Sequence, residues 1–156
     1  MGGPNTIKSR FRSKSDHSLD TKGRLNLPSR FREVLSHYGS NKLILAPWKG
    51  HLRIYPLSEW EIMEDRLMDQ VREQPDLRGF IRMVLSGATD CKTDKQGRLL
   101  LPVSLRTEIK MGKDVILTGM RDWIEIWDAD AWNSEMQSTR ETFDTLDEGL
   151  AKLGIL

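Results

Sequence analysis

The chain has 156 residues, a length that suits one compact domain or two small ones, and its 38% hydrophobic and 30% charged residues exclude an intrinsically disordered chain. Its strongly apolar runs, such as Val115–Leu117, are far shorter than the roughly 20 residues that a membrane helix needs, so we expect no membrane partner. The single cysteine, Cys91, excludes a disulfide within the chain and favours a cytoplasmic protein.

Positive charge is concentrated near the beginning of the chain, although the net charge is only +1. We interpret residues 1–10 as an N-terminal extension that overlaps the basic segment. Eight basic residues between positions 8 and 32 face two acidic ones, so this segment carries +6 and the rest of the chain −5. A localised basic surface suits a polyanion, while a solvated flexible arm explains the same charge equally well.

The sequence repeats itself at an offset of 74 residues. Asp20–Arg32 matches Asp94–Arg106 at the Asp, Gly, Arg, Leu, Leu, Pro and final Arg positions. Further along, Leu52–Trp60 matches Ile124–Trp132 at an offset of 72. Matches that keep their order, with one small gap, indicate a duplicated structural unit.

Each copy is predicted to begin with a β-hairpin that contains an Asp-x-x-Gly-Arg turn. Gly23 and Gly97 accept the positive φ that a tight hairpin turn often demands. The residues Leu25 and Leu27 flank a polar residue, an alternation that is typical of a strand following the turn.

A short helix and a second hairpin complete each copy. Pro28 and Pro102 end the strand and preset the first helical turn, and we expect the helices to end near Gly39 and Gly112, which can act as C-terminal caps. In the second hairpin, the apolar residues of 43–45 and 52–54 are expected to alternate with polar neighbours.

Helices are predicted after both copies. The pattern Ser58-x-x-Glu61 indicates a capping box at the start of the first helix, and Pro75 ends that helix. An apolar stripe at helical spacing over residues 77–85 predicts a second helix, and spaced apolar residues from Trp132 onward predict a third. We expect residues 149–156 to form an apolar tail.

These elements define a β-rich α+β fold of two pseudo-symmetric β-hairpin–helix–β-hairpin repeats with flanking helices. The predicted divisions are an extension over 1–10, a first repeat over 11–60, linking helices over 61–87, a second repeat over 88–132, and a C-terminal helix and tail over 133–156.

The chemistry of the turn centres on its arginine. Arg24 and Arg98 start the return strands, and a guanidinium fork fits phosphate oxygens or the O6 and N7 atoms of guanine. The preceding aspartates, Asp20 and Asp94, can accept the turn amides or hold the guanidinium in one orientation. The alternative is a plain surface ion pair contributing about 0–1 kcal/mol, and the residues alone leave the two readings open.

At this point the residues resemble a known family. Asp20–Pro28 and its copy Asp94–Pro102, together with Phe80–Ala88 and Ile126–Asp128, are similar to MraZ, a family of bacterial regulators with two domains of the SpoVT–AbrB type. The resemblance runs from about Phe11 to Trp132.

The resemblance implies a cytoplasmic, nucleoid-associated protein that binds double-stranded DNA and regulates the division and cell-wall gene cluster, including its own promoter, usually as a repressor. Family members bind short direct repeats and assemble into homo-oligomeric rings, and their two half-domains pair into a swapped-hairpin, split-barrel-like unit. Carried over to this chain, the DNA-binding residues are Arg24, Arg98, Lys22, Lys95, Gln96, Arg12 and Lys14, with Asp20, Gly23, Asp94 and Gly97 orienting the turns. The second copy departs from the first at Gln96, which stands where the first has Lys22, so we expect the two tips to contribute unequally.

Two other classes of function remain. A ring-forming scaffold could bind an acidic protein through its turns, and an antitoxin-type module could embrace a toxin with its C-terminal helix. An enzyme is not expected, because the sequence shows no nucleophile–base pair and no phosphate-binding glycine loop. The three histidines lie far apart in the sequence, so we predict no metal site and no cofactor.

Overall fold

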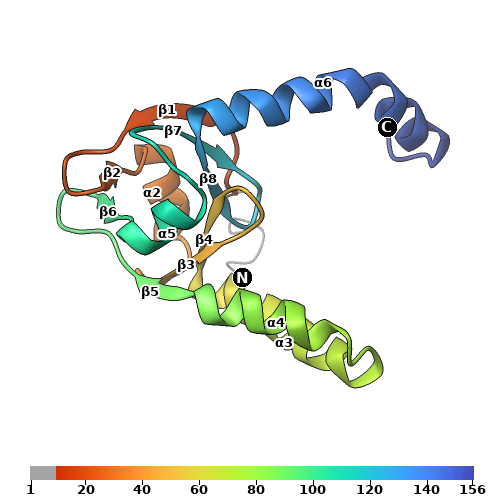
Figure 1. Ribbon diagram of the computed structural model, residues 1–156, viewed down its shortest axis with the longest axis horizontal. Coiled ribbons are helices and arrows are strands. Elements are labelled where there is room, and N and C mark those ends of the chain that lie inside the picture. The colour runs from red at the N-terminus through yellow and green to blue at the C-terminus, as the bar shows by residue number, and fades with distance from the viewer. Residues whose placement is uncertain (1–9) are drawn as a thin grey trace.

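The computed structural model describes residues 10–156, so the predicted N-terminal extension lies outside the described residues except for Arg10. The strands are β1 (Lys14–Ser18), β2 (Arg24–Asn26), β3 (Leu43–Pro47), β4 (Leu52–Pro56), β5 (Thr89–Cys91), β6 (Arg98–Leu100), β7 (Asp114–Gly119) and β8 (Ile124–Asp128) (Figure 1). The helices are α2 (Ser29–Ser36), α3 (Leu57–Glu73), α4 (Leu77–Gly87), α5 (Val103–Glu108) and α6 (Ala129–Lys152).

The strands form a six-stranded antiparallel sheet in the order β1-β7-β8-β4-β3-β5 and a two-stranded ribbon of β2 and β6. Pairing crosses between the repeats, since β1 pairs with β7, β5 with β3, and β2 with β6. The two strands that flank each Asp-x-x-Gly-Arg turn therefore pair with strands of the other repeat, so the β-hairpin predicted at each turn is wrong although the tight turn itself is present. The β-rich mixed class and the two repeats predicted from the sequence are confirmed.

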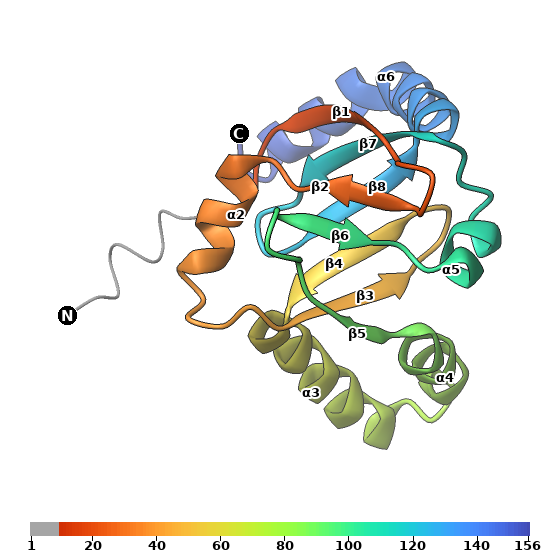
Figure 2. The same cartoon turned by 90° about the vertical axis from the view of Figure 1, so that its left-hand side faces the viewer.

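The main core lies between the six-stranded sheet and the ribbon. The ribbon contributes Leu25 and Leu99, and the sheet contributes Leu45, Leu117 and Ile126, all at most 1% exposed. Figure 2 shows the ribbon in front of the sheet, with α2 and α5 on either side of it. Burial of these alternating residues fixes which face of the ribbon points outward, because a shift of one residue would expose the leucines.

A second apolar cluster covers the opposite face of β3 and β4. Ile44 and Ala46 point away from the main core and are buried together with Tyr55 under α3 and α4, which contribute Trp60 and Val84. The predicted alternation with polar neighbours is therefore wrong for β3, because the main core covers one of its faces and α3 and α4 cover the other, so polar side chains there would lose their hydration.

The capping box predicted at Ser58 and Glu61 is wrong. Helix α3 begins at Leu57 after the N-cap residue Pro56, and no side chain caps it. The backbone amide of Leu57 donates to the carbonyl oxygen of Lys42, so a neighbouring segment satisfies a group at the helix start.

The predicted glycine cap is right in position for the first repeat and wrong for the second. Gly39 follows α2 with a φ of +67°, as expected. In the second repeat α5 ends at Glu108, and the left-handed residue is Lys110 with a φ of +57°. Gly112 instead donates its amide to the carboxylate of Asp128, at 2.8 Å.

Helix α6 is longer than the sequence suggested. It starts at its N-cap residue Asp128, whose carboxylate accepts the amide of Ala131, and it continues to Lys152. The tail predicted over residues 149–156 is thus helical in its first half. Within residues 10–156, no helix combines the length and hydropathy needed to cross a membrane.

A buried charged cluster lies at β4 and β8 and the residues just before them, on the face of the sheet between α3 and α6. Glu125 accepts hydrogen bonds from the indole nitrogens of Trp123 and Trp127, at 3.2 and 3.0 Å. His51 Nε2 lies 3.3 Å from Glu125 Oε2, and the Arg53 guanidinium lies 4.8 Å from the centre of the Trp123 ring. Burial alone would raise the pKa of Glu125, but hydrogen bonds from His51 and the indoles outweigh it and lower the pKa to about 2.

This cluster predicts a loss of stability in acid. Because the folded state depresses the pKa of Glu125, its contribution is complete above the ordinary glutamate range and disappears as the pH falls toward 2. We expect up to about 3 kcal/mol of unfolding free energy to be lost through this group between about pH 5 and pH 2. Urea denaturation of the native protein and of Glu125→Gln across this range measures it, and identical pH profiles would contradict the assignment.

Candidate nucleic-acid interface

The first Asp-x-x-Gly-Arg turn is held by the carboxylate of Asp20. One carboxylate oxygen accepts the backbone amides of Lys22 and Arg24, both at 2.9 Å, and the other accepts Arg24 Nε at 2.7 Å. Gly23 closes the turn with a φ of +81°, and its amide donates to the carbonyl of Asp20. Asp20 therefore makes both kinds of contact considered for it: it accepts hydrogen bonds from the turn amides, and it orients the guanidinium.

The second turn repeats this geometry almost atom for atom. Asp94 accepts the amides of Gln96 and Arg98 at 2.9 Å and Arg98 Nε at 2.8 Å, and Gly97 has a φ of +77°. One contact is particular to this turn, because Arg98 Nη2 also donates to Gln96 Oε1, at 3.4 Å. The corresponding Lys22 has no acceptor to offer.

The bound arginines keep both aspartates charged. Donation by the backbone amide of Arg24 lowers the pKa of Asp20, and the Arg24 guanidinium lowers it further. The pKa of Asp94 is lowered in the same way, first by the amide and then by the guanidinium of Arg98. Each aspartate accepts a hydrogen bond from the Nε atom of its arginine, so the terminal Nη atoms lie at the end of the side chain, beyond that contact.

The β2–β6 ribbon joins the two turns into one surface. Arg24 stands opposite Leu100 and Asn26 opposite Arg98, and the carbonyls of Gly23 and Gly97 accept amides from the other repeat. Because strand residues alternate between faces and Leu25 is buried, all four paired residues lie on the outward face. The Arg24 and Arg98 side chains remain 28% and 30% exposed.

Two further arginines lie against the turns. The Arg106 guanidinium packs on Gly23, where an added Cβ would approach it to 2.6 Å, and Arg32 packs in the same way on Gly97. Each is fixed by its Nε, which donates to the carbonyl of Leu101 or Leu27. Neither arginine belongs to the site predicted from the sequence, although their match at the repeat offset is a usable signal.

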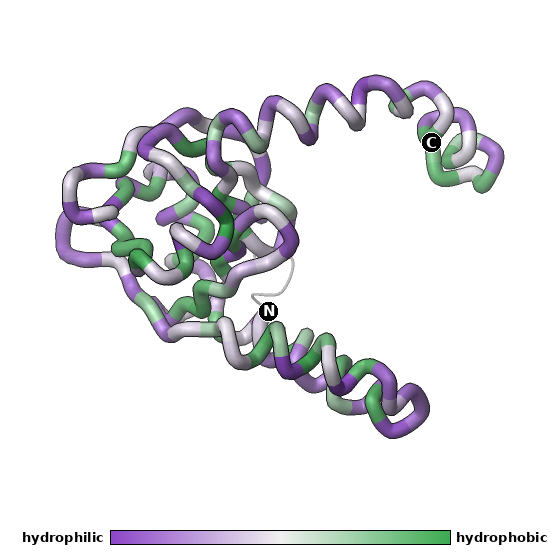
Figure 3. Tube along the Cα trace, viewed as in Figure 1, coloured by the Kyte–Doolittle hydropathy of each residue, from purple (hydrophilic) through white to green (hydrophobic). Residues whose placement is uncertain are grey.

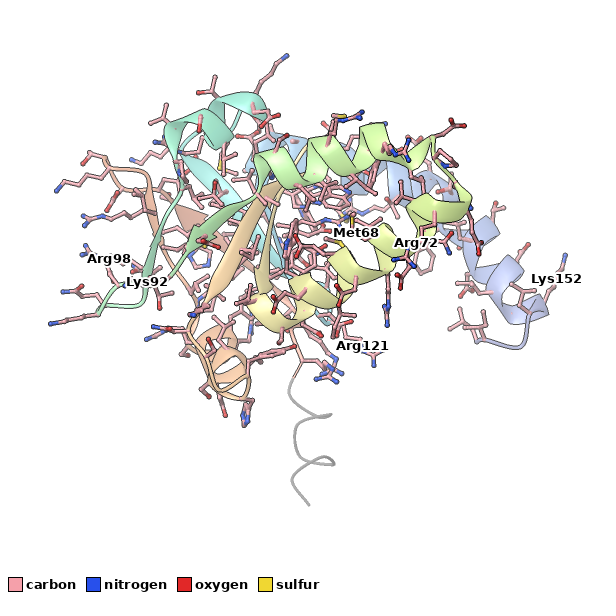
Figure 4. The ribbon with its side chains drawn as sticks, turned by 90° about the horizontal axis from the view of Figure 1, so that it is seen from below. Met68, Arg72, Lys92, Arg98, Arg121 and Lys152 are labelled. Atoms are coloured by element: carbon pink, nitrogen blue, oxygen red, sulfur yellow. The ribbon has the colours of Figure 1, made fainter. Side chains whose placement is uncertain are left out.

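The surface formed by the ribbon and its turns is strongly basic. Its charged residues are Lys22, Arg24, Arg32, Lys95, Arg98 and Arg106, against Asp20 and Asp94. The turns lie at the end of the molecule opposite the arms formed by α3, α4 and α6 (Figure 1). Figure 4 shows Arg98 projecting from this end, with Arg72 of α3 and Lys152 of α6 on the far side.

The structure does not bring Arg12 and Lys14 to this surface. Lys14 lies on β1 opposite Thr118, forms an ion pair with Asp16 at 3.6 Å, and lines a groove beside the start of α6. Arg12 lies beside Gly119 at the connection between β7 and β8. The remaining five predicted DNA-binding residues lie on the turns and the ribbon.

Metal binding finds no support in the described part of the chain. Among residues 10–156, no group of three or more His, Cys, Asp or Glu side chains is arranged to hold a metal ion. The half-buried thiol of Cys91 is also a poor nucleophile, because burial raises its pKa to about 12.

Comparison with known proteins agrees with the duplicated architecture. A family model described as "MraZ protein, putative antitoxin-like" matches residues 11–83 and again 84–153. A protein of Pediococcus pentosaceus named transcriptional regulator MraZ is 37% identical over 145 residues, which cover 93% of this chain and 99% of the relative. Proteins of the same name from Desulfitobacterium hafniense and Limosilactobacillus reuteri are 39% and 40% identical, over 89% and 86% of this chain and 95% and 92% of their own lengths. The chain belongs to the MraZ family.

Proposed function

We propose that this protein is a transcriptional regulator that binds DNA sequence-specifically through the β2–β6 ribbon. The observation that carries the proposal is the pair of aspartate-held guanidiniums, Arg24 and Arg98, on one outward face. A two-stranded ribbon fits the major groove of B-DNA, where arginine binds guanine in a bidentate manner. The names of the relatives, which are transcriptional regulators, support this function over an enzyme.

Different side chains of the ribbon and its turns make the base contacts and the phosphate contacts. Arg24 and Arg98 reach base edges, while Lys22 and Lys95, exposed in the turns, neutralise phosphates on either side. Gln96 orients Arg98 through the contact described above. Arg12 and Lys14 lie apart from the ribbon and contribute only to the general attraction of the protein for DNA.

The family resemblance suggests where the protein acts. We propose that it represses the division and cell-wall gene cluster, including its own promoter, by binding short direct repeats there as a cytoplasmic, nucleoid-associated ring. Several ribbons held at fixed spacing on one ring raise the effective concentration of each contact after the first.

Footprinting of the purified protein on the DNA upstream of its own gene tests this function. We expect protection of repeated short sites at physiological salt, and much weaker binding to unrelated DNA of the same length. Equal affinity for both DNAs would contradict sequence-specific regulation.

A protein-interaction scaffold or antitoxin-type module is the second candidate. It is favoured by the wording of the family description and by α6, most of which extends beyond the sheet. The same comparison of promoter DNA with unrelated DNA separates the candidates, because a scaffold that binds an acidic protein would show no preference for promoter DNA.

Helix α6 offers a surface for ring assembly. Apolar residues recur along it at alternating spacings of three and four, the seam of a coiled coil, with only Thr139 interrupting them. The seam consists of Trp132, Met136, Thr139, Phe143, Leu146, Leu150 and Leu153. Its outer half is exposed, with Phe143 at 60% and Leu153 at 74%. Figure 3 shows hydrophobic residues scattered along this mostly hydrophilic helix and gathered at its end.

We propose that a second copy of the chain covers this seam with its α4. The outer part of α6, from Arg140 to Lys152, carries four acidic residues and two basic ones, whereas α4 carries Arg78 and Arg82 and no acidic residue. Helix α4 also exposes Met83, at 76%. Since α4 and α6 of one chain point apart (Figure 1), the contact would join different copies head to tail, and such contacts give a ring when the rotation from one copy to the next closes.

Substitution of the seam tests the assembly. Leu146→Glu places a charge in the proposed contact, so we expect light scattering to report a smaller particle than for the native protein. Thr145→Glu, one position along and off the seam, is the matched control and should keep the native mass. If Leu146→Glu also keeps it, or if the native protein is a monomer, assembly through α6 is wrong.

A further inference from the structure

The ribbon has an approximate two-fold axis that passes through its central pair, Leu25 and Leu99. The register pairs Arg24 with Leu100 and Asn26 with Arg98, so rotation about this axis exchanges the two arginines. The same rotation exchanges Asn26 with Leu100. The arginines are therefore equivalent by symmetry, while the outward residues beside them differ.

This difference gives the ribbon two chemically distinct ends. At one end Arg24 stands beside Leu100, which is 53% exposed, and at the other Arg98 stands beside the exposed Asn26. The side-chain amide of asparagine pairs with N6 and N7 of adenine, whereas an apolar side chain contacts the methyl group of thymine. Both positions share the outward face with the arginines, so whatever the arginines contact, these side chains are next to it.

The two turns also carry different side chains at equivalent positions. The first turn carries Thr21 and Lys22, and the second carries Lys95 and Gln96 at the equivalent positions. Of the equivalent residues Lys22 and Gln96, only Gln96 has a side chain that can accept a hydrogen bond, and it accepts one from Arg98 Nη2. The lysine proposed to contact phosphate stands one residue earlier in the second turn than in the first.

We propose that Asn26 and Leu100 are specificity-determining residues that make each chain bind DNA in a single orientation. The Asn26–Arg98 end recognises an adenine next to a guanine, and the Arg24–Leu100 end recognises a guanine next to a thymine. A truly symmetric ribbon would favour an inverted site, because site symmetry mirrors protein symmetry. An asymmetric ribbon instead favours sites that all have the same orientation along the DNA. This inference rests on the proposed function, since it assumes that the ribbon contacts bases.

The test uses duplexes that contain one footprinted site and its single-base variants, measured by fluorescence anisotropy at fixed salt. For Asn26→Ala we expect discrimination at one adenine to fall about tenfold, with discrimination elsewhere unchanged. Asn133→Ala, which removes an exposed asparagine from α6, is the matched control and should behave as the native protein.

Leu100 is tested by changing the DNA. Replacing one thymine at a time with uracil removes only the methyl group, and we expect one such change to weaken binding of the native protein several-fold and to leave binding by Leu100→Ala unaffected. The double exchange Asn26→Leu with Leu100→Asn presents the same two ends with the ribbon turned around on the duplex, so it should recover most of the affinity that either single exchange loses.

The outcomes separate this inference from the function on which it rests. If the native protein prefers no sequence, the proposed function fails. If it is specific but both alanine variants keep the native pattern of base discrimination, the function stands and the roles of Asn26 and Leu100 are overturned.

Discussion

Replacing both Arg24 and Arg98 with alanine should reduce affinity for the promoter site about a thousandfold. Each bidentate contact with guanine is worth about 1–3 kcal/mol, and two such losses of about 2 kcal/mol give this factor. Folding should be unaffected, because both side chains lie on the outward face and the backbone amides of the turn continue to bind Asp20 and Asp94. Mobility-shift titration against the footprinted site measures the loss.

Two control variants define what the arginines contribute. Arg72→Ala removes an arginine from α3, on the far side of the molecule in Figure 4, and should leave affinity near the native value. Arg24→Lys keeps the charge but loses the planar fork and the Nε that Asp20 holds, so it should keep its affinity for unrelated DNA and lose discrimination at the guanine assigned to Arg24. Unchanged specific affinity in the double alanine variant would refute the placement of the binding site.

Gly119→Ala should be the most damaging small substitution for stability. A methyl group on Gly119 would overlap the backbone of Phe11 and Arg12, which crosses directly over it and which a side-chain rotation cannot relieve. Its amide also donates to Ser13, and the fully buried Phe11 ring packs against Phe31 at 5.7 Å. We expect a loss of about 3 kcal/mol or more in the free energy of unfolding.

Gly149→Ala is the matched control for this effect. Nothing lies within 4 Å of the added methyl group, and the residue is inside α6, where alanine is preferred over glycine. Urea denaturation should therefore show a lower midpoint for Gly119→Ala and no loss for Gly149→Ala. Equal midpoints would mean that the backbone around Phe11 moves to accommodate the methyl group without a loss in the free energy of unfolding.

Local residue patterns predicted the local features of the fold. The positive φ of Gly23 and Gly97, the short helix after Pro28 and the break near Pro75 each depend on the conformational preference of one residue. The capping box failed because Pro56, two residues before the serine, starts α3. Two adjacent patterns can each mark the start of a helix. Which of them does so depends on the conformation of the preceding backbone, and the sequence alone does not give that conformation.

The candidate site was predictable only in part, for a similar reason. The Asp–Arg contact of each turn spans four residues, so its spacing is visible in the sequence. The placement of Asn26 and Leu100 beside the arginines depends on the register of β2 against β6, strands that lie far apart along the chain. The buried Glu125 was missed because a carboxylate in a strand normally indicates exposure.

The exchange of strands between the repeats has a consequence for the history of the chain. Since β1 needs β7 and β5 needs β3, one repeat alone would leave its sheet incomplete, and two separate copies could supply the same ladders to each other. In a homodimer any substitution necessarily appears twice. With the halves joined through α3 and α4 in one chain, a change in one half does not impose the same change on the other, so the two turns can diverge independently.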